Sequence, residues 1–246
     1  MPDPRAILVT GGSRGIGAAI CRRLAAAGHP VCVNYAAGAP AAEAVAADSR
    51  ARGGRAATIA ADVSDPDAVA RMFDAAEQAL GPLGGLVNNA GIIGGTSRVD
   101  ALPPADLARV LQVNVAGAFL CAQQAVRRLS TAHGGAGGAI VNLGSVASRL
   151  GSPGEFVHYA MTKGAIDTFT TGLAREVAAE GIRVNAVAPG LIATDMNPQE
   201  RQDRHVGTIP ARRVGQPEEI AEAVAWLISD AASYVNGTIL TVSGGR

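Results

Sequence analysis

The sequence predicts an α/β protein with a single doubly wound (Rossmann) domain, in which a central parallel sheet of about seven strands is flanked by helices. Three observations predict this fold. Short apolar runs alternate with amphipathic helical stretches along the chain, and a glycine-rich turn follows the first of the apolar runs. The length of 246 residues suits one large domain, which we expect to span 1–246 and to combine dinucleotide binding with catalysis.

The expected strands are short, apolar and bounded by Gly, Pro or Asn, which is typical of strands buried on both faces of a parallel sheet. They are residues 6–10, 31–35, 56–61, 86–88, 139–143, 183–187 and 238–242.

The expected helices carry capping signals. One helix spans 16–27 and ends before Gly28, and another opens at Pro66, just after Asp65. Long helices are expected at 106–130 and 159–180, and a last one begins at Pro217, whose following glutamates suit a helix N-terminus. Residues 191–207 break the alternation, and we expect them to form a substrate lid.

Composition excludes several classes of protein. The net charge is formally zero and no basic tract occurs, so neither nucleic acid nor a membrane surface is an expected partner. Apolar runs such as 139–143 are too short to span a bilayer, and the first residues resemble no signal peptide. The three cysteines form no CxxC pair, which favours a reduced, cytoplasmic protein. The four histidines have no metal-ligand spacing, so no metal site is expected. His158 is expected to be exposed at the start of a helix, and a place at the mouth of the substrate site is the alternative.

The turn after the first strand has the pattern G-x-x-x-G-x-G. Glycines allow the tight turn, the approach of a pyrophosphate to the backbone, and close helix–strand packing. The N–H groups and dipole of the following helix favour an anion. Glycine-rich turns without a ligand also occur, but this one lies between a strand and a helix. The residues expected to bind the dinucleotide here are Gly11, Ser13, Arg14, Gly15, Ile16 and Gly17.

The end of the second strand indicates which ribose is preferred. Sites for NAD place a carboxylate there, whereas this chain has Asn34 and Tyr35. Arg14 in the turn offers a cation for a 2′-phosphate, although a solvated loop arginine is the alternative. We therefore expect NADP(H) to be the preferred cofactor, with NAD(H) possible.

A candidate catalytic pair is Tyr159 and Lys163, four residues apart and thus on one helix face. A nearby ammonium is expected to lower the pKa of the phenol, so that Tyr159 exchanges a proton with a substrate oxygen while a hydride moves at the carbon. Ser145 follows a predicted core strand, where open α/β sheets bind ligands. Taken alone, a solvent-facing helix pair and a turn serine would explain these residues.

Together these motifs resemble the short-chain dehydrogenase/reductase family over essentially the whole chain. Within it, the chain is most similar to bacterial glucose/ribitol-type dehydrogenases and 3-oxoacyl-carrier-protein reductases. The stretches that carry the resemblance are Thr10–Gly17, Asp62-Val63, Asn88-Asn89-Ala90-Gly91, Asn114, Ser145, Tyr159 with Lys163, Pro189-Gly190 and Thr194.

The resemblance implies roles for these positions. Asp62 and Val63 would contact the adenine, and Lys163 would bond the nicotinamide ribose and lower the pKa of Tyr159. Asn114 would hold a water that connects Lys163 to solvent. Further cofactor contacts would come from Asn88, Ala90, Gly91, Pro189, Gly190, Ile192 and Thr194. The C-terminal segment resembles segments that pack in homotetramers.

The expected function is hydride transfer between a nicotinamide dinucleotide and a small carbonyl or secondary alcohol, such as a sugar, polyol or ketone. A 3-oxoacyl-carrier-protein reductase is an alternative; it needs a basic docking patch, for which Arg127-Arg128 and Arg212-Arg213 are the candidates. A protein that senses NADP without turnover is a second alternative. It would not need the serine, tyrosine and lysine that are all present here.

Overall fold

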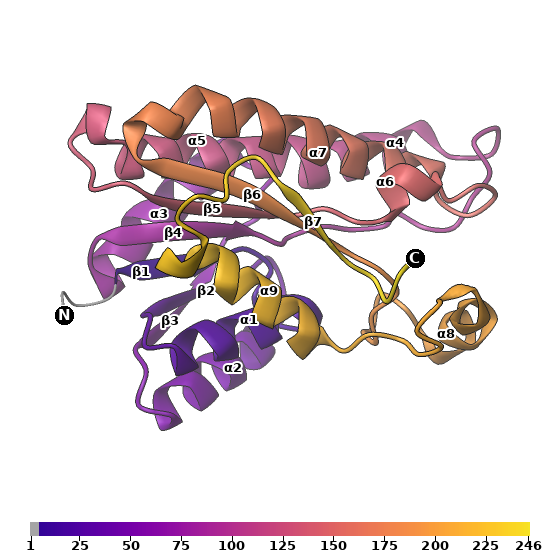
Figure 1. The fold of residues 1–246 in the computed structure, drawn as a ribbon, viewed down its shortest axis with the longest axis horizontal. Helices are drawn as coiled ribbons and strands as arrows, with labels where there is room; N and C mark the ends of the chain where they lie inside the picture. The colour runs from indigo at the N-terminus through magenta and orange to yellow at the C-terminus, as the bar shows by residue number, and fades with distance from the viewer. Residues whose placement is uncertain (1–4) are drawn as a thin grey trace.

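The computed structural model describes residues 5–246, and its centre is a parallel sheet of the seven predicted strands (Figure 1). Residues 1–4, part of the stretch examined for a signal peptide, lie outside the described residues. The strand order is β3-β2-β1-β4-β5-β6-β7. The strands are β1 (Ala6–Val9), β2 (Val31–Tyr35), β3 (Ala56–Ala60), β4 (Leu83–Asn88), β5 (Gly138–Leu143), β6 (Ile182–Pro189) and β7 (Ile239–Val242).

The prediction of the sheet is confirmed, and the largest difference lies at β4. This strand begins at Leu83, three residues before the predicted start at 86. Gly84 and Gly85 hid the beginning of the strand, since glycine is normally depleted in strands. Glycine is required at 85, because a Cβ there would lie 2.7 Å from the carbonyl oxygen of Ala139 on the neighbouring strand.

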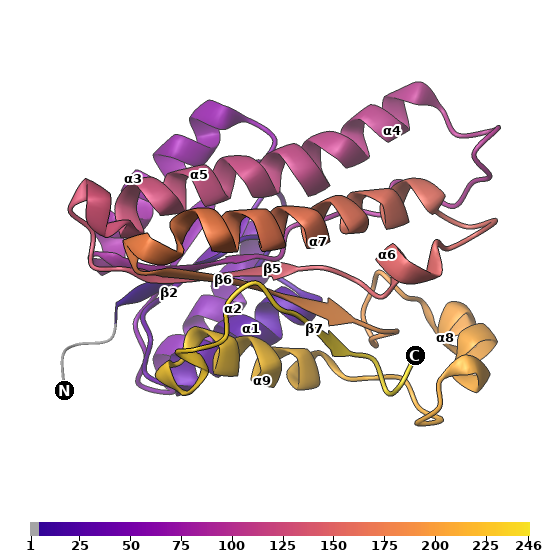
Figure 2. The ribbon, with the colours of Figure 1, turned by 45° about the horizontal axis from the view of Figure 1, so that its top comes forward.

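Helices cover both faces of the sheet (Figures 1 and 2). The buried side chains form one apolar cluster under each helical layer. One layer consists of α1 (Gly15–Ala26), α2 (Ala39–Ala51) and α9 (Pro217–Ile228). The other consists of α3 (Pro66–Leu80), α4 (Pro104–Leu111), α5 (Ala118–Leu129) and α7 (Val157–Val177). Helix α2 was not predicted; it begins after Gly38, which has a positive φ, and has a proline in its first turn.

The predicted helix 106–130 is continuous over Pro104–Leu129 but contains a π-helical segment, Gln112–Gly117, between α4 and α5. By length and composition alone this helix is long and apolar enough to cross a membrane, which the short apolar runs of the sequence do not indicate. Core helices of globular proteins pass the same test. Here the side chains of Val110, Cys121 and Leu129 are buried, and those of Cys121 and Leu129 belong to the apolar cluster that includes Leu8 of β1 and Ile140 of β5.

Two short helices lie beyond the carboxyl ends of the strands, α6 (Ala147–Leu150) and α8 (Gln199–His205) (Figure 2). Helix α8 lies within 191–207, the segment that the sequence predicts as a substrate lid, and the 3₁₀ turn Val206–Thr208 ends just beyond it. Both helices therefore stand at the edge of the sheet where open α/β folds bind ligands.

Candidate active site

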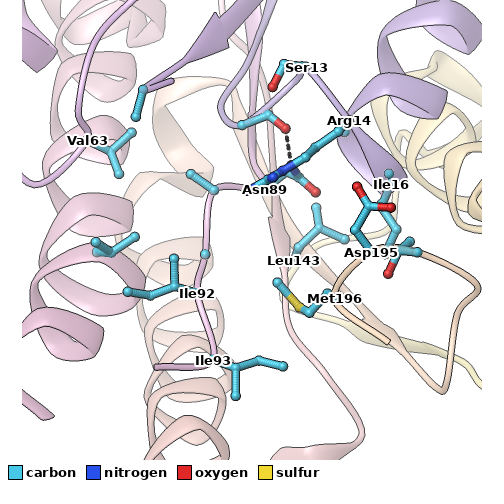
Figure 3. Close-up of a pocket in the computed structure, with 18 of the residues that line it drawn as sticks. Ser13, Arg14, Ile16, Val63, Asn89, Ile92, Ile93, Leu143, Asp195 and Met196 are labelled. Carbon is cyan, nitrogen blue, oxygen red and sulfur yellow. Dashed lines mark hydrogen bonds between the residues drawn. The ribbon is translucent and has the colours of Figure 1, made fainter. Parts of the chain in front are cut away.

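A cavity of about 640 Å³ opens at the carboxyl edge of the sheet, and it brings most of the predicted site residues together. Figure 3 shows the turn residues Ser13 and Arg14 at one end, and Ile92, Ile93 and Met196 at the other. The predicted residues that line it are Gly11, Ser13, Arg14, Gly15, Ile16, Gly17, Asn34, Tyr35, Asp62, Val63, Ala90, Gly91, Ser145, Tyr159, Lys163, Pro189, Gly190, Ile192 and Thr194.

The glycine turn has the geometry of a phosphate cradle. Gly11 and Gly15 have φ angles of +61° and +51°, which other residues rarely adopt. A Cβ on Gly17 would lie 2.2 Å from the carbonyl oxygen of Gly11, so only glycine fits there. Helix α1 begins at Gly15, and within the described residues the side chain of Arg14, at the N-cap position, makes no capping hydrogen bond. The first N–H groups of the helix thus remain available to a pyrophosphate, and the residues fit a dinucleotide.

Asn89, which the sequence analysis did not assign to the site, braces this turn. Its side-chain amide donates to the carbonyl oxygens of Thr10 and Gly11, each at 2.9 Å. The Thr10 hydroxyl accepts hydrogen bonds from the backbone N–H groups of Asn89 and Ala90 at 3.0 Å. Asn88, by contrast, was expected to line the cavity but does not. Alternate residues of a strand face opposite sides of the sheet, so Asn88 and Asn89 point in different directions. The Asn88 side chain is buried, and its amide donates to the side-chain oxygen of Asn142 at 3.0 Å.

The ribose end of the cavity lies where β2 ends. Asn34 is buried, with its oxygen accepting from the Gly11 N–H at 3.2 Å and its amide donating to the carbonyls of Ile59 and Ala61. Asn34 therefore joins the turn to the sheet, and Tyr35, the last residue of β2, lines the cavity. No carboxylate ends β2, as the sequence indicated.

Tyr159, Lys163 and Ser145 meet at the other end of the cavity. Tyr159 lies in the first turn of α7, and the Lys163 ammonium one turn later is 5.6 Å from the centre of its ring. The ammonium donates a hydrogen bond of 2.6 Å to the carbonyl of Leu143, the last residue of β5. The Ser145 hydroxyl, two residues beyond β5, accepts from the N–H of Ala147 at 3.1 Å.

Burial dominates the protonation of this pair. It raises the pKa of the Tyr159 phenol to about 12, against the smaller lowering effects of the Ser145 hydroxyl and the Arg201 charge. Burial also lowers the pKa of Lys163 to about 8, against the charge of Asp167. Lys163 is not among the groups that shift the pKa of Tyr159 here, so its expected lowering effect stays a prediction for the protein with a bound nicotinamide. The phenol stays protonated at neutral pH, which suits a proton donor.

Asn114 lies behind the catalytic pair, in the π-helical segment. It is buried, with its oxygen accepting from the N–H of Ile92 at 2.9 Å and its amide donating to Ile92 and to Thr162. Its role in a water relay stays a prediction. π-Helical turns often occur at functional sites, but no residue pattern distinguishes them from α-helix in the sequence.

His158 is a correction. It was expected to be exposed, but it is buried, and its Nε2 lies 2.8 Å from the carbonyl oxygen of Ile93. The start of α7 is covered there by the segment after β4, which sequence periodicity does not reveal. Within residues 5–246, no group of three or more His, Cys, Asp or Glu could hold a metal ion.

A cradle for a pyrophosphate, joined in one cavity to a serine, a tyrosine and a lysine, defines a nicotinamide-dependent oxidoreductase. A family model described as enoyl-(acyl carrier protein) reductase, of the short-chain dehydrogenase type, matches residues 11–246. The chain belongs to the short-chain dehydrogenase/reductase family. It is 52% identical to an uncharacterized oxidoreductase, YgfF, of Escherichia coli, over 97% of this chain and 98% of that one.

Other relatives carry more specific names. A 3-oxoacyl-[acyl-carrier-protein] reductase of Synechocystis is 41% identical, over 97% of this chain and 95% of that one. Among solved structures, a short-chain dehydrogenase/reductase of Serratia marcescens has a TM-score of 0.93 and 39% identity, covering 100% of this chain and 99% of that one. A short-chain dehydrogenase of Burkholderia cenocepacia, solved in complex with NADP, has a TM-score of 0.91 and 39% identity, covering 99% and 97%.

Proposed function

We propose that this chain is an NADP(H)-preferring oxidoreductase that reduces a small carbonyl compound or oxidises the corresponding secondary alcohol, with Tyr159 as the general acid and base. The observation that carries the proposal is the meeting of Ser145, Tyr159 and Lys163 with the phosphate cradle in one cavity. A nicotinamide bound there would supply or accept the hydride.

The residues around the substrate oxygen would each have a distinct role. The Tyr159 phenol, protonated at neutral pH, gives its proton to the carbonyl oxygen as charge develops there. The Ser145 hydroxyl holds the same oxygen by a hydrogen bond. Lys163, anchored by the Leu143 carbonyl, keeps a positive charge beside the phenol and favours its ionised form in the reverse direction. Asn114 fixes the backbone of Ile92 at the cavity wall.

The preference for NADP(H) is supported by the wall at the end of β2. A carboxylate there would repel a 2′-phosphate, and the described chain has Tyr35 instead, with Arg14 lining the same cavity. Binding of NADP by the Burkholderia relative and of NADPH by a protein from a metagenomic library, at 37% identity, agrees with this proposal.

The alternative, reduction of a 3-oxoacyl chain on an acyl carrier protein, is favoured by the names of relatives at 39–41% identity. Its docking patch is poorly supported. Arg128 is largely buried and paired with Asp74 and Glu77, and Arg213 is paired with Glu219 at 2.6 Å. Two of the four candidate arginines are thus already neutralised, which leaves little charge for an acidic carrier.

The substrate side of the cavity is lined by apolar residues and by residues of the proposed lid. Residues 191–207, the proposed lid, contribute Asp195, Met196 and Asn197 to the cavity lining. Figure 3 shows Met196 across the cavity from Ile92 and Ile93. The apolar side chains on this side favour a ketone with an apolar substituent, whereas Asp195 and Asn197 offer hydrogen-bond partners to the hydroxyls of a polyol.

We also propose that the protein is a cytoplasmic homotetramer. Three buried free cysteines suit a reducing compartment. Strand β7 is an edge strand, and Trp226 and Tyr234 near it are exposed, as expected of a surface that another subunit covers. Light scattering that gives a concentration-independent monomer mass would contradict the tetramer.

The proposed activity is tested by following NADPH absorbance with ethyl acetoacetate, acetoacetyl-N-acetylcysteamine, a cyclic diketone and D-glucose, the last with NADP⁺. Turnover of at least one carbonyl compound supports the proposal. Turnover of an acetoacetyl-carrier protein at least a hundredfold faster, by kcat/KM, than any small compound would favour the alternative. NADPH binding without turnover of any of them would contradict the proposed enzyme.

A further inference from the structure

We propose that Arg201 of helix α8 is a positioning residue of the active site, which latches the lid onto the segment before α7 and holds Phe156 against Tyr159. The proposal deepens the proposed function, on which it rests, and concerns side chains outside the cavity lining. Three contacts carry it: an ion pair with Glu155, a cation–π contact with Phe156, and the packing of Phe156 on the catalytic tyrosine.

The ion pair joins two segments that are far apart in the sequence. Arg201 Nη1 lies 2.8 Å from Glu155 Oε2, and His205, one turn later on α8, has its Nε2 3.1 Å from Glu155 Oε1. The side chains of Arg201 and Glu155 are only 20% and 21% exposed, so solvent screens the pair less than a surface pair. The cluster holds the pKa of Glu155 below its usual range, which keeps the carboxylate charged.

Glu155 also contacts the segment that follows β4. Its backbone carbonyl accepts a hydrogen bond of 2.8 Å from the N–H of Ser97, in the segment after β4. The loop after α6 has positive φ angles at Gly151, Ser152 and Gly154, which turn the chain back toward the site. Glu155, in the loop before α7, therefore connects that loop with both the segment after β4 and the lid.

The guanidinium of Arg201 continues this contact toward the chemistry. It lies over the Phe156 ring, 4.4 Å from its centre, and Phe156 packs edge-on against Tyr159 with 5.7 Å between ring centres. Phe156 is the residue that caps α7, so its position determines where the first turn, and with it Tyr159, begins. The Arg201 charge is felt at the phenol, whose pKa it lowers.

A second branch runs from Arg201 to the cofactor side. Its Nε donates to the Asn197 side-chain oxygen at 3.2 Å, and the Asn197 amide donates to the carbonyl of Ile192 at 3.0 Å. Ile192 and Asn197 line the cavity. Glu155 and Asn197 each accept a hydrogen bond from Arg201, through Nη1 and Nε, and the Phe156 ring covers one face of the guanidinium. These contacts suit Arg201 to hold the cavity wall in place.

The test compares Arg201→Ala with Arg204→Ala on the same helix. Arg204 is 59% exposed, pairs with Glu200 at 2.8 Å and approaches Glu155 only to 3.9 Å, so it is a matched control. We expect Arg201→Ala to speed hydrogen–deuterium exchange at least fivefold in peptides covering 199–208 and also in those covering 155–161. Arg204→Ala should change neither by more than twofold. Exchange is measured on the full-length protein without substrate, so it tests the latch even if no compound is turned over.

The catalytic consequence is measured with the fastest carbonyl compound found above. Arg201→Ala should lower kcat at least tenfold, while the Kd for NADPH stays within threefold, because the phenol rather than the cradle is displaced. Glu155→Gln should also lower kcat. The double variant should lose little more kcat than Arg201→Ala, because the two substitutions remove the same ion pair. Arg201→Lys, which keeps the charge but not the planar face, should restore lid protection more than kcat.

Two results would overturn the inference. One is equal exchange in wild type and Arg201→Ala over 155–161, because the lid would then be independent of the tyrosine. The other is an equal loss of kcat in Arg201→Ala and Arg204→Ala. Failure of the proposed function is distinct, because it would be seen in the wild type as NADPH binding without turnover. A melting temperature of Arg201→Ala within a few degrees of wild type excludes global unfolding as the cause.

Discussion

Asp62 and Arg109 form an ion pair at the end of the cavity that is expected to hold the adenine, with Oδ2 and Nη2 2.8 Å apart. The Arg109 guanidinium also donates to the Ser64 hydroxyl at 2.7 Å, and Ser64 bonds the same carboxylate. These contacts hold the pKa of Asp62 below its usual range, so it stays ionised at neutral pH. Arg109 was missing from the sequence-based site, because only the fold brings α4 beside the end of β3.

We expect Arg109→Gln to weaken NADPH binding about two- to fivefold, the effect of losing one partly exposed ion pair. The reason is that Asp62 loses the partner that orients it toward the adenine site. Fluorescence titration of NADPH measures the change. Arg52→Gln, which breaks the exposed pair with Asp48, is the control and should leave the Kd unchanged. Equal affinities of both variants would show that the pair does not organise the cavity.

Tyr159→Phe should keep the affinity for NADPH and remove nearly all turnover, roughly 10²–10⁴-fold in kcat, because the hydroxyl carries the proton. Steady-state rates and NADPH titration measure the two effects separately. Lys163→Ala should in addition weaken NADPH binding, since its ammonium is expected to reach the ribose. Activity of Tyr159→Phe within tenfold of wild type, a change in barrier below about 1.4 kcal/mol, would exclude the assignment.

The pH profile follows from Lys163. Its pKa is lowered to about 8, so the ammonium beside Tyr159 is lost as the pH rises through 8, well before the phenol ionises. If the charged form is the active one, reductive kcat/KM should be flat below pH 7 and decline above pH 8. Rates at constant ionic strength measure this. A rise in reductive kcat/KM between pH 8 and 9 would be opposite in sign and would contradict it.

Gly17→Ala should destabilise the protein by about 1–3 kcal/mol, because the added methyl group would meet the Gly11 carbonyl oxygen at 2.2 Å and the Asn89 amide at 2.5 Å. The melting temperature measures the effect, and NADPH binding should be lost with it. Gly164→Ala, within α7, meets nothing inside 4 Å and should instead be neutral or stabilising by up to about 1 kcal/mol. Similar melting temperatures for both variants would mean that the turn relaxes freely.

The sequence predicted the sheet well because buried parallel strands such as β2 are short apolar runs with clear ends. Features that depend on tertiary approach were not predictable in this way. Asn88 and Asn89 are adjacent and chemically identical, and only the strand register decides which one braces the glycine turn. The pKa of Tyr159 was predicted from its neighbour Lys163, whereas its burial, which no spacing reveals, has the larger effect.

The proposed preference for NADPH over NADH rests on Arg14, which lines the cavity, and on the absence of a carboxylate at the end of β2. A charge-assisted contact to the 2′-phosphate contributes about 1.5–3 kcal/mol, or roughly ten- to hundredfold in affinity. Arg14→Ala should therefore remove most of the preference. Tyr35→Asp should reverse it, because a carboxylate at the cavity wall would repel the phosphate and accept a hydrogen bond from the 2′-hydroxyl of NADH. Tyr35→Asn introduces a side chain of the same size as aspartate but without its charge, so it is the matched control and should keep the preference. Titrations of both cofactors against the four proteins decide the question: tighter NADH in the wild type would show that Arg14 does not reach the phosphate.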